Sequence, residues 1–451
     1  MNCYIVTCLL FLSIVNTIGN VHGGLFKSRV RTQPEQIHLS LGSNPSEMTV
    51  TWTTFDRTDQ SIVGYGKRKI EESVSGYSSK FTDGGFERRS MYIHRATMTN
   101  LEPGETYVYR VGSDLGWSPI FWFKAIKNGS DWSPRLAVYG DLGNDNSKSL
   151  PRLQEDAQSG RFDAIHHNGD FAYDLHSDNA RIGDEFMRQI EPIAAYVPYQ
   201  TSVGNHEQAY NFSNYVNRFS MVDTQSGQIN NHFYSYNLGP AHIISFSTEF
   251  YFFIQYGLGQ MFTQFEWLEA DLIEANKPEN REQRPWIITL GHRPMYCNTD
   301  GLLSILDDCR QRESVVRKGL PIFHLLGLED LFYKYGVDLE IWAHEHLYER
   351  LWPIYDQKVY NGSTSEPYTN PGAPVHVTTG SAGCPEGIDP FVSHPADWSA
   401  VRISDYGFSV MTIHNKTHLT YQQLSADKNH SIVDQFTIVK DKHGPYRHVI
   451  N

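Results

Sequence analysis

The feature that most constrains the fold of this 451-residue chain is a series of five short apolar segments, each running directly into polar residues able to bind a metal ion. The apolar segments have the length and character of buried strands. Because the carboxyl ends of strands in an α/β sheet line one crevice, the polar groups are predicted to converge in space. In chain order they are Gly140-Asp141, Asn168-Gly169-Asp170 with Tyr173 three positions on, Gly204-Asn205-His206-Glu207, Gly291-His292 and Ala343-His344-Glu345-His346.

Taken singly, each group has a plainer explanation. An Asp after a strand often caps a helix. The pair Asn205-His206 is equally typical of a turn, and Tyr173 is equally typical of an aromatic residue in the core. A His-x-His pair is more often solvated or part of a core than bound to a metal. The ordered recurrence at five strand ends favours a metal site instead, and the glycines allow backbone and ligand to approach closely.

The rest of the chain divides into regions of different pattern. Residues 33–124 alternate as β-strands do, with Gly-, Ser- and Asp-rich turns between them, which predicts an all-β module. After Ser133 strands alternate with helices expected at 150–158, 185–196 and 265–276, which is typical of an α/β domain. Beyond about Gly372 a smaller segment with strand-like pieces is predicted to pack on that domain.

The module's last strands carry a more specific signal. Leu101, Pro103, Gly104, Tyr107 and Tyr109 resemble the tyrosine-corner region of fibronectin type III sandwiches, where a Tyr hydroxyl ties a strand to the preceding turn. Any β-sandwich with an aromatic strand is the alternative. The predicted boundaries are 1–23 for a signal peptide, 24–130 for the fibronectin-like domain, 131–370 for the catalytic domain and 371–451 for the C-terminal segment.

The beginning of the chain predicts export. Its apolar core at residues 9–15 is shorter than the roughly 20 residues that span a bilayer and has the length of a secretory signal, although no Lys or Arg precedes it. The mature protein is therefore predicted to be secreted, with no membrane partner. Acceptor sequons for N-glycosylation, which support this route, begin at Asn128, Asn211, Asn361, Asn415 and Asn429.

Cysteine spacing and charge limit the chemistry further. Cys3 and Cys8 lie in the predicted signal, Cys297 and Cys309 enclose a short Asp-rich loop and are the natural disulfide pair, and Cys384 is left free or intermolecular. The formal net charge is −13, from 38 basic and 51 acidic residues. A nucleic-acid partner is therefore not expected, because phosphate-backbone binding draws on clustered Lys and Arg.

The ordered series resembles the metallophosphoesterase superfamily and, through Tyr173, the purple acid phosphatases, which place a tyrosinate on a ferric ion. The resemblance covers nearly the whole mature chain and is closest to the long animal form of the family. It implies an α/β metallophosphoesterase sandwich, with two mixed sheets flanked by helices, behind the fibronectin type III-like domain.

Carried over by position, the resemblance implies a dinuclear centre. Fe(III) would be bound by Asp141, Tyr173 and His346; Zn(II), Fe(II) or Mn(II) would be bound by Asn205, His292 and His344; and Asp170 would bridge both. Phenolate and carboxylate suit a trivalent iron, and imidazole and amide oxygen suit a borderline divalent ion. His206 follows a ligand but is expected to hydrogen-bond the phosphate or the leaving oxygen, or else to orient Asn205.

The implied activity is that of a secreted acid phosphatase, in which a metal-bound hydroxide attacks small phosphomonoesters in line. A phosphodiesterase or nucleotidase on the same site, and a non-catalytic adhesion or binding protein, are the alternatives; the oligomeric state stays open. Two departures from the family pattern stand out. Ala343 replaces a Gly, and the stretch 293–297 lacks the further histidines of plant members, leaving Tyr296 and Glu345 as candidate general acids.

Overall fold

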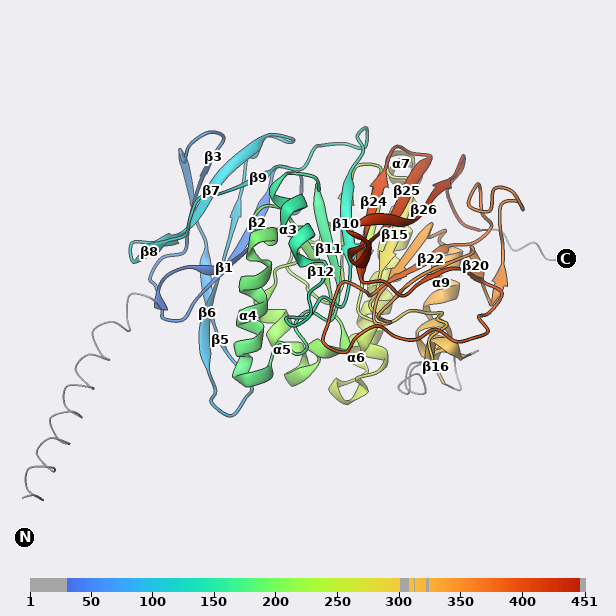
Figure 1. Ribbon diagram of the computed structural model, residues 1–451. Helices are drawn as coiled ribbons and strands as arrows, with labels where there is room; N and C mark the ends of the chain where they lie inside the picture. The colour runs from blue at the N-terminus through green and yellow to red at the C-terminus, as the bar shows by residue number, and fades with distance from the viewer. Residues whose placement is uncertain (1–30, 301–307, 312, 322–323, 447–451) are drawn as a thin grey trace, which may run out of the picture.

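The computed structural model describes residues 31–300, 308–311, 313–321 and 324–446. An all-β domain lies beside a larger α/β domain, as Figure 1 shows from blue to red along the chain. The predicted signal peptide, residues 1–23, falls outside the described residues. In the part of the chain that is described, every helix is too short or too polar to cross a membrane.

The N-terminal domain is a sandwich of two antiparallel sheets. The first has the order β1 (Glu35–Leu41), β2 (Met48–Thr54), β6 (Ser90–Met98) and β5 (Tyr77–Thr82). The second has the order β4 (Glu72–Ser75), β3 (Ile62–Gly66), β7 (Thr106–Ser113) and β8 (Gly116–Trp117), with β9 (Phe121–Lys124) also paired to β7. The hydroxyl of Tyr107 accepts a hydrogen bond of 2.9 Å from the backbone N–H of Glu102 in the preceding turn. This contact is the tyrosine corner that the sequence predicted.

The α/β domain contains two mixed sheets. One has the order β12 (Tyr199–Ser202), β11 (Ala164–Asn168), β10 (Arg135–Tyr139), β24 (Gly407–Ile413), β25 (His418–Ser425) and β26 (Ser431–Val439). The other has the order β13 (Tyr234–Leu238), β14 (Ala241–Ser245), β15 (Trp286–Leu290), β18 (Leu339–Trp342), β22 (Val375–Thr379), β19 (Tyr348–Leu351) and β23 (Ser399–Ile403). The strands β10, β11 and β12 are parallel, as are β14, β15, β18 and β22. All five polar groups therefore follow parallel strands, three in one sheet and two in the other.

The C-terminal segment supplies strands to both of these sheets. β22 lies between β18 and β19, and β24 pairs antiparallel with β10. The contact is closer than the surface packing expected from the sequence, because hydrogen-bonded strands of the segment complete each sheet. The loops that join these strands are thereby placed beside the ends of the strands that carry the predicted ligands.

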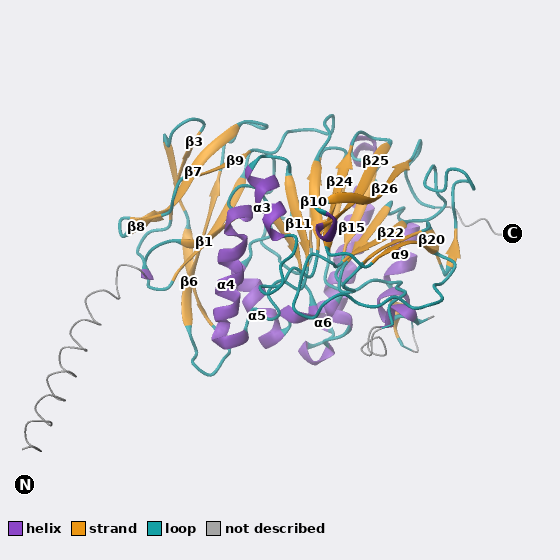
Figure 2. Cartoon of the chain, in the orientation of Figure 1, coloured by secondary structure: helices purple, strands orange, loops and turns teal. Residues whose placement is uncertain are grey.

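Helices cover the sheets of the α/β domain. Among them, α4 lies between the sheet that contains β10, β11 and β12 and the N-terminal sandwich (Figure 2). The helices are α3 (Leu150–Gln158), α4 (Ser177–Ala194), α5 (Ala209–Arg218), α6 (Gly259–Ala275), α7 (Pro278–Gln283), α8 (Val315–Lys318) and α9 (Leu328–Lys334). Short pieces complete the fold: η1 (Asn205–Glu207), η2 (Glu249–Tyr251), η3 (Ile254–Tyr256), η5 (Asp308–Arg310), η6 (Ala426–Lys428), β16 (Gly319–Leu320), β17 (Leu325–Leu326), β20 (Ile354–Tyr355) and β21 (Lys358–Val359).

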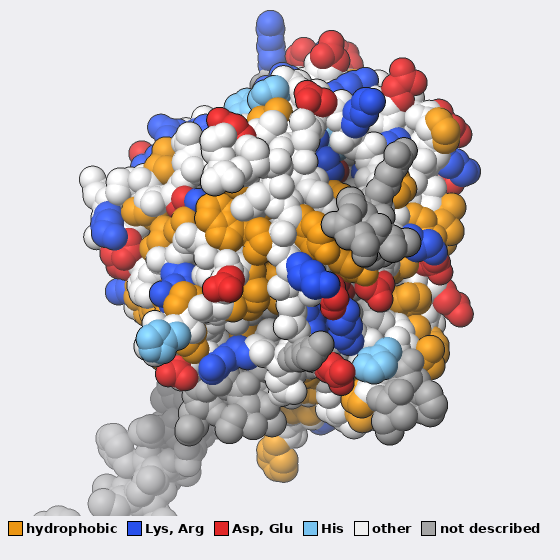
Figure 3. Space-filling model, turned by 90° about the vertical axis from the view of Figure 1, so that its right-hand side faces the viewer, with side chains coloured by type: hydrophobic (Ala, Val, Ile, Leu, Met, Phe, Trp, Pro, Cys, Tyr) orange, Lys and Arg blue, Asp and Glu red, His pale blue; other side chains and the backbone are white. Residues whose placement is uncertain are grey.

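The predicted helix at 150–158 is confirmed residue for residue, whereas α4 and α6 begin earlier than expected. In α4 the first turn is polar and residues 178–180 have left-handed backbone, so apolar periodicity could not reveal it. On the face in Figure 3, acidic and basic side chains are interspersed among apolar ones.

Candidate metal centre

The structure brings the first predicted group of metal ligands into direct contact. The hydroxyl oxygen of Tyr173 lies 2.8 Å from Nε2 of His346 and 3.3 Å from Oδ1 of Asp141. His346 Nε2 lies 3.5 Å from the same carboxylate oxygen. These side chains follow β11, β18 and β10, so two different sheets meet at this point.

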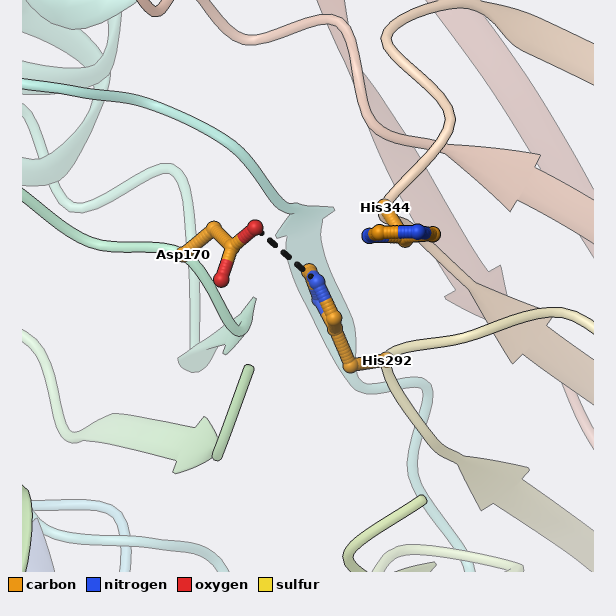
Figure 4. A group of neighbouring side chains, drawn as sticks. All are labelled: Asp170, His292 and His344. Atoms are coloured by element: carbon orange, nitrogen blue, oxygen red, sulfur yellow. Dashed lines mark ion pairs between the residues drawn. The ribbon is translucent and has the colours of Figure 1, made fainter. Parts of the chain in front are cut away.

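The second group forms beside it. Nε2 of His292 lies 3.1 Å from Oδ2 of Asp170 and 3.2 Å from Oδ1 of Asn205. Asp170, His292 and His344 each offer a ligand atom within 4.8 Å of the others. Asp170 and His292 point toward one another in Figure 4, and His344 approaches from a separate strand end. A backbone hydrogen bond of 3.1 Å from His344 to Oδ2 of Asp141 connects the two groups.

The backbone at the centre is unusual for residues with side chains. Asp141, Asp170, Tyr173 and His344 all have φ between 51° and 68°. Such left-handed conformations cost energy for non-glycine residues and concentrate at functional sites, where surrounding packing holds them.

Glycines next to these residues provide the space they need. A Cβ on Gly204 would lie 2.3 Å from Oδ1 of Asp170, and one on Gly169 would lie 2.4 Å from Nδ1 of His292. Ala343, the departure from the family pattern, packs its methyl group against Gly140. A Cβ on Gly140 would lie only 2.4 Å from Cβ of Ala343. The substitution is therefore accommodated by the glycine opposite.

Hydrogen bonds fix the orientation of two histidines in the way that metal ligands require. His292 donates from Nδ1 to the carbonyl of Asn168 at 2.8 Å, and His346 donates from Nδ1 to the carbonyl of Gly387 at 3.1 Å. Each ring therefore turns Nε2 toward the centre, where it would offer a lone pair to a metal ion after losing its proton, which is the usual arrangement for a metal-ligating imidazole. This donor chemistry fits two metal ions.

A buried carboxyl group supports the site from behind. Glu207 accepts hydrogen bonds of 3.0 Å from the backbone N–H groups of Asp170, Phe171 and Gly204. Burial, and then the charge of Asp170, raise the pKa of Glu207 to about 8. Glu207 thus holds together two of the loops that carry predicted ligands.

Electrostatics show that the centre favours positive charge. Burial alone lowers the pKa of His292, but the Asp170 carboxylate reverses this and raises the pKa to about 10. Burial and the charges of Asp141 and Asp170 raise the pKa of Tyr173 well above its ordinary value. A phenolate at Tyr173 therefore requires a strongly charged cation beside it.

His206 lies at the edge of the centre rather than among the ligands. Its Nδ1 is 2.6 Å from Oδ1 of Asp174, and its ring lies against that of Tyr173 with centroids 4.3 Å apart. Its Nε2 is 4.0 Å from Oδ2 of Asp170 and 3.7 Å from Oε1 of Glu386. Burial lowers the pKa of His206, but Asp170 and then Asp174 raise it to about 9.

The sequence gave no indication that Asp174, Glu386 or Cys384 would lie beside the centre. Asp174 directly follows Tyr173, so the motif that contains Tyr173 could have indicated it. The other two belong to a loop of the C-terminal segment, where Sγ of Cys384 lies 3.4 Å from Nδ1 of His346, and Asp389 accepts the backbone N–H of His346 at 2.7 Å. No local pattern links this loop to the centre.

The two candidate general acids are in other surroundings. Tyr296 is buried, and its hydroxyl contacts Glu329 and lies 3.1 Å from Arg317. Glu345 is buried beside the sulfur of Cys309, at 3.5 Å. The chain after β15 and β18 directs both side chains into packed interior.

The predicted disulfide is present between Cys297 and Cys309, whose Cα atoms are 5.4 Å apart, and Cys384 is a buried free thiol. The five asparagines of the glycosylation sequons, which the structure describes, are all exposed: Asn128, Asn211, Asn361, Asn415 and Asn429.

A two-sheet α/β fold with this donor set at its strand ends defines a metallophosphoesterase. Comparison with known proteins agrees along the chain: residues 34–125 match the purple acid phosphatase N-terminal domain, 134–348 the calcineurin-like phosphoesterases, and 373–435 the C-terminal region of iron/zinc purple acid phosphatase-like proteins.

The chain is 55% identical to acid phosphatase type 7 of Danio rerio over 92% of its length and 93% of the relative's. It is 54% identical to acid phosphatase type 7 of Homo sapiens over 98% of its length and 97% of the relative's. A purple acid phosphatase from yellow lupin seeds has the same fold, with a TM-score of 0.74 and 24% identity, over 91% of this chain and 75% of that one. The chain belongs to the purple acid phosphatase family. It is an acid phosphatase, and the family implies a binuclear metal centre that acts on phosphate esters.

Proposed function

We propose that the protein is a secreted enzyme that hydrolyses small phosphomonoesters, with Fe(III) held by Asp141, Tyr173 and His346. The observation that carries this proposal is the position of the Tyr173 hydroxyl, in contact with both Asp141 and His346. Phenolate and carboxylate are hard anionic donors of the kind that trivalent iron prefers.

The second group would hold a divalent ion. Asn205, His292 and His344 offer an amide oxygen and imidazole nitrogens, which suit Zn(II), Fe(II) or Mn(II). Asp170 has one carboxylate oxygen 3.1 Å from His292 and is the residue proposed to bridge the two ions. When bound, the two ions would supply Lewis acidity toward the phosphoryl group and an activated water as nucleophile.

The protein's own side chains orient the substrate. His206 presents Nε2 toward the centre, while Asp174 accepts from Nδ1 at 2.6 Å and keeps the ring in this orientation. A histidine so placed can hydrogen-bond a phosphoryl oxygen and give a proton to the departing alkoxide. Glu207 keeps the loops of Asp170 and Asn205 in register through its backbone hydrogen bonds.

The test combines metal analysis, a visible spectrum and turnover of paired substrates on one preparation. One iron and one further metal per chain, a visible charge-transfer band, and faster turnover of p-nitrophenyl phosphate than of bis-p-nitrophenyl phosphate are expected. Faster diester turnover would favour a phosphodiesterase. Iron-loaded, oxidised protein without a band would remove Tyr173 from the ligand set.

Secretion is proposed from the predicted signal, the disulfide and the exposed sequons. Expression of the full chain in animal cells should deliver protein to the medium, with a mass that falls on treatment with an N-glycosidase. Retention inside the cell without glycan would contradict this part of the proposal.

A further inference from the structure

Two adjoining cavities lie where the N-terminal sandwich meets the α/β domain. The larger has a volume of about 210 Å³, and its lining includes the β1–β2 turn at 42–47, the segment 126–129 and, from the α/β domain, Thr224, Asn237 and Arg284. The smaller, of about 90 Å³, shares these last three residues. Sites for drug-sized ligands usually measure about 300 to 1,000 Å³, so the larger cavity suits a small ligand.

Arg284 brings a cation without a counter-charge to both cavities. Its Nε is buried and has no hydrogen-bond partner among the residues that the structure describes, while Nη1 has a long contact of 3.4 Å with Oε1 of the exposed Gln283. Burial lowers the pKa of Arg284, and no described carboxylate opposes this shift, whereas Asp338 opposes it at nearby Arg281. Withdrawing a guanidinium from water without a paired anion is unfavourable, so a bound anion would stabilise this position.

Asn237 supplies a second donor in the same place. The ring of His242 lies between two acceptors, with Nδ1 2.9 Å from Oδ1 of Asn237 and Nε2 2.7 Å from Oδ2 of Asp271. Because Oδ1 of Asn237 accepts from this histidine, the amide is fixed in orientation and its Nδ2 group is left for an acceptor outside the pair. Lys127 adds a second positive charge at the exposed rim of the larger cavity.

The two carboxylates that line the cavities already have partners. Glu47 accepts hydrogen bonds from the backbone N–H and the hydroxyl of Ser43, at 3.1 and 2.7 Å. Glu274 forms an ion pair of 2.6 Å with Lys277. In the described part of the chain neither carboxylate is paired with Arg284, so its guanidinium remains for a ligand.

We propose that this junction is a binding site for a small oxyanion, such as phosphate or sulfate, held by the guanidinium of Arg284 and the amide of Asn237. Arginine donates strong, charge-assisted hydrogen bonds to such oxygens in a planar fork. Arg284 precedes β15 and His292 follows it, and a strand rises roughly 3.3 Å per residue, so β15 alone separates the two by about 15 Å. The site is therefore distinct from the metal centre.

The variants isolate the guanidinium and the amide. Arg284→Met removes the charge and keeps a long apolar side chain at a half-exposed position. Asn237→Asp is the second variant, because it keeps an acceptor for His242 and places negative charge beside the anion. Arg110→Met is the matched control: Nε of Arg110 is also buried without a partner among the described residues, but Arg110 stacks on Trp117 at 4.3 Å and lines neither cavity.

Two measurements on the metal-loaded full chain test the proposal. Calorimetric titration of wild type with inorganic phosphate should give two sites, one of them the metal centre, and the other should weaken about 10- to 100-fold in Arg284→Met and in Asn237→Asp. Replacing chloride by sulfate at equal ionic strength should raise the melting temperature of wild type and Arg110→Met more than that of Arg284→Met. The control accounts for the general stabilising effect of sulfate.

A single phosphate site in wild type that Arg284→Met retains would place the anion at the metal centre only and overturn the proposal. Equal behaviour of Arg284→Met and Arg110→Met in both measurements would overturn it as well. Titration with sulfate separates the sources: tighter binding of phosphate at the second site identifies the reaction product as occupant, equal binding identifies a general oxyanion site, and either supports the proposal. The test does not depend on turnover, so absence of phosphatase activity would refute the proposed function alone.

Discussion

The N-terminal sandwich and the metal centre both bury histidines, but the two regions shift their pKa values in opposite directions. His94 in the sandwich has Thr54 and Ser61 hydroxyls at 2.9 and 2.8 Å, and burial lowers its pKa to about 4. His292 is equally inaccessible, yet the carboxylate of Asp170 raises its pKa to about 10. Burial alone therefore does not set the pKa of a buried histidine, because a neighbouring carboxylate reverses the direction of the shift.

Removing the Asp170 carboxylate should have the largest effect, because it eliminates the group that makes the pKa of His292 differ from that of His94. Asp170→Asn takes away the charge beside His292 and the proposed bridging ligand together, so metal content should fall and turnover of p-nitrophenyl phosphate should drop by more than about 10³-fold. Elemental analysis and kcat on the same preparation test this. Asp56→Asn, at an exposed ion pair with Arg31, should change neither. Full metal content in Asp170→Asn would refute the bridging role.

His206 sharpens the comparison, because its raised pKa places it with the site histidines although it is proposed not to bind metal. His206→Ala should retain both metals while kcat falls by about 10²- to 10⁴-fold, the usual contribution of a general acid or base. His418→Ala, at an exposed position, is the control and should have wild-type kcat. Loss of one metal from His206→Ala would make His206 a ligand.

Substitution of Tyr173 tests whether the first metal is an Fe(III) ion bound by a tyrosinate. Tyr173→Phe keeps the ring beside His206 and removes the oxygen that contacts Asp141 and His346, so the visible band should disappear while the fold survives. Turnover should fall less than in Asp170→Asn, since the other ligands remain. Tyr296→Phe, at the buried tyrosine away from the predicted ligands, should keep the colour. A coloured Tyr173→Phe protein would contradict the tyrosinate assignment.

The smallest effect belongs to the sandwich. Since the pKa of His94 is about 4 when folded and about 6.5 when unfolded, the unfolded chain binds the proton first, and stability is lost as pH falls through this window. His94→Gln should reduce the drop in unfolding free energy between pH 7 and pH 4.5 by about 2 kcal/mol. Urea titrations at both pH values measure it. An equal drop in wild type and variant would show that His94 is not the group that responds.

Much of the fold and the centre could be predicted because the signals are local. Each apolar segment and the polar residue that follows it lie within a few positions of one another, so the pattern is visible in the local sequence at Asp141, Asp170, Asn205, His292 and His344. The spacing of the disulfide cysteines is equally short. The helix at 150–158 was equally clear, since Pro151 marks its start and Leu153 and Ala157 mark its buried face. The start of α4 was missed because its first turn is polar and left-handed.

Side-chain direction after a strand could not be predicted. Tyr296 and Arg293 are three residues apart on one loop, yet Tyr296 turns into the core toward Glu329 and Arg317, whereas Arg293 reaches His344. The sequence offered Tyr296 as a candidate acid and had no argument for Arg293. The packing of η2 decides between them, because Glu249 holds the guanidinium in place.

The sequence by itself determined the types of the predicted ligands, their order along the chain and the strand ends that carry them, because periodicity and turn chemistry act over short distances. Only the tertiary structure decided which polar groups surround those ligands. The loop of Cys384 and Asp389 reaches His346 because β22 is inserted between β18 and β19, and Asp174 reaches His206 because β11 and β12 are adjacent. Contacts between residues far apart in sequence depend on strand pairing and on the packing of two sheets, and one sequence read segment by segment does not contain that information.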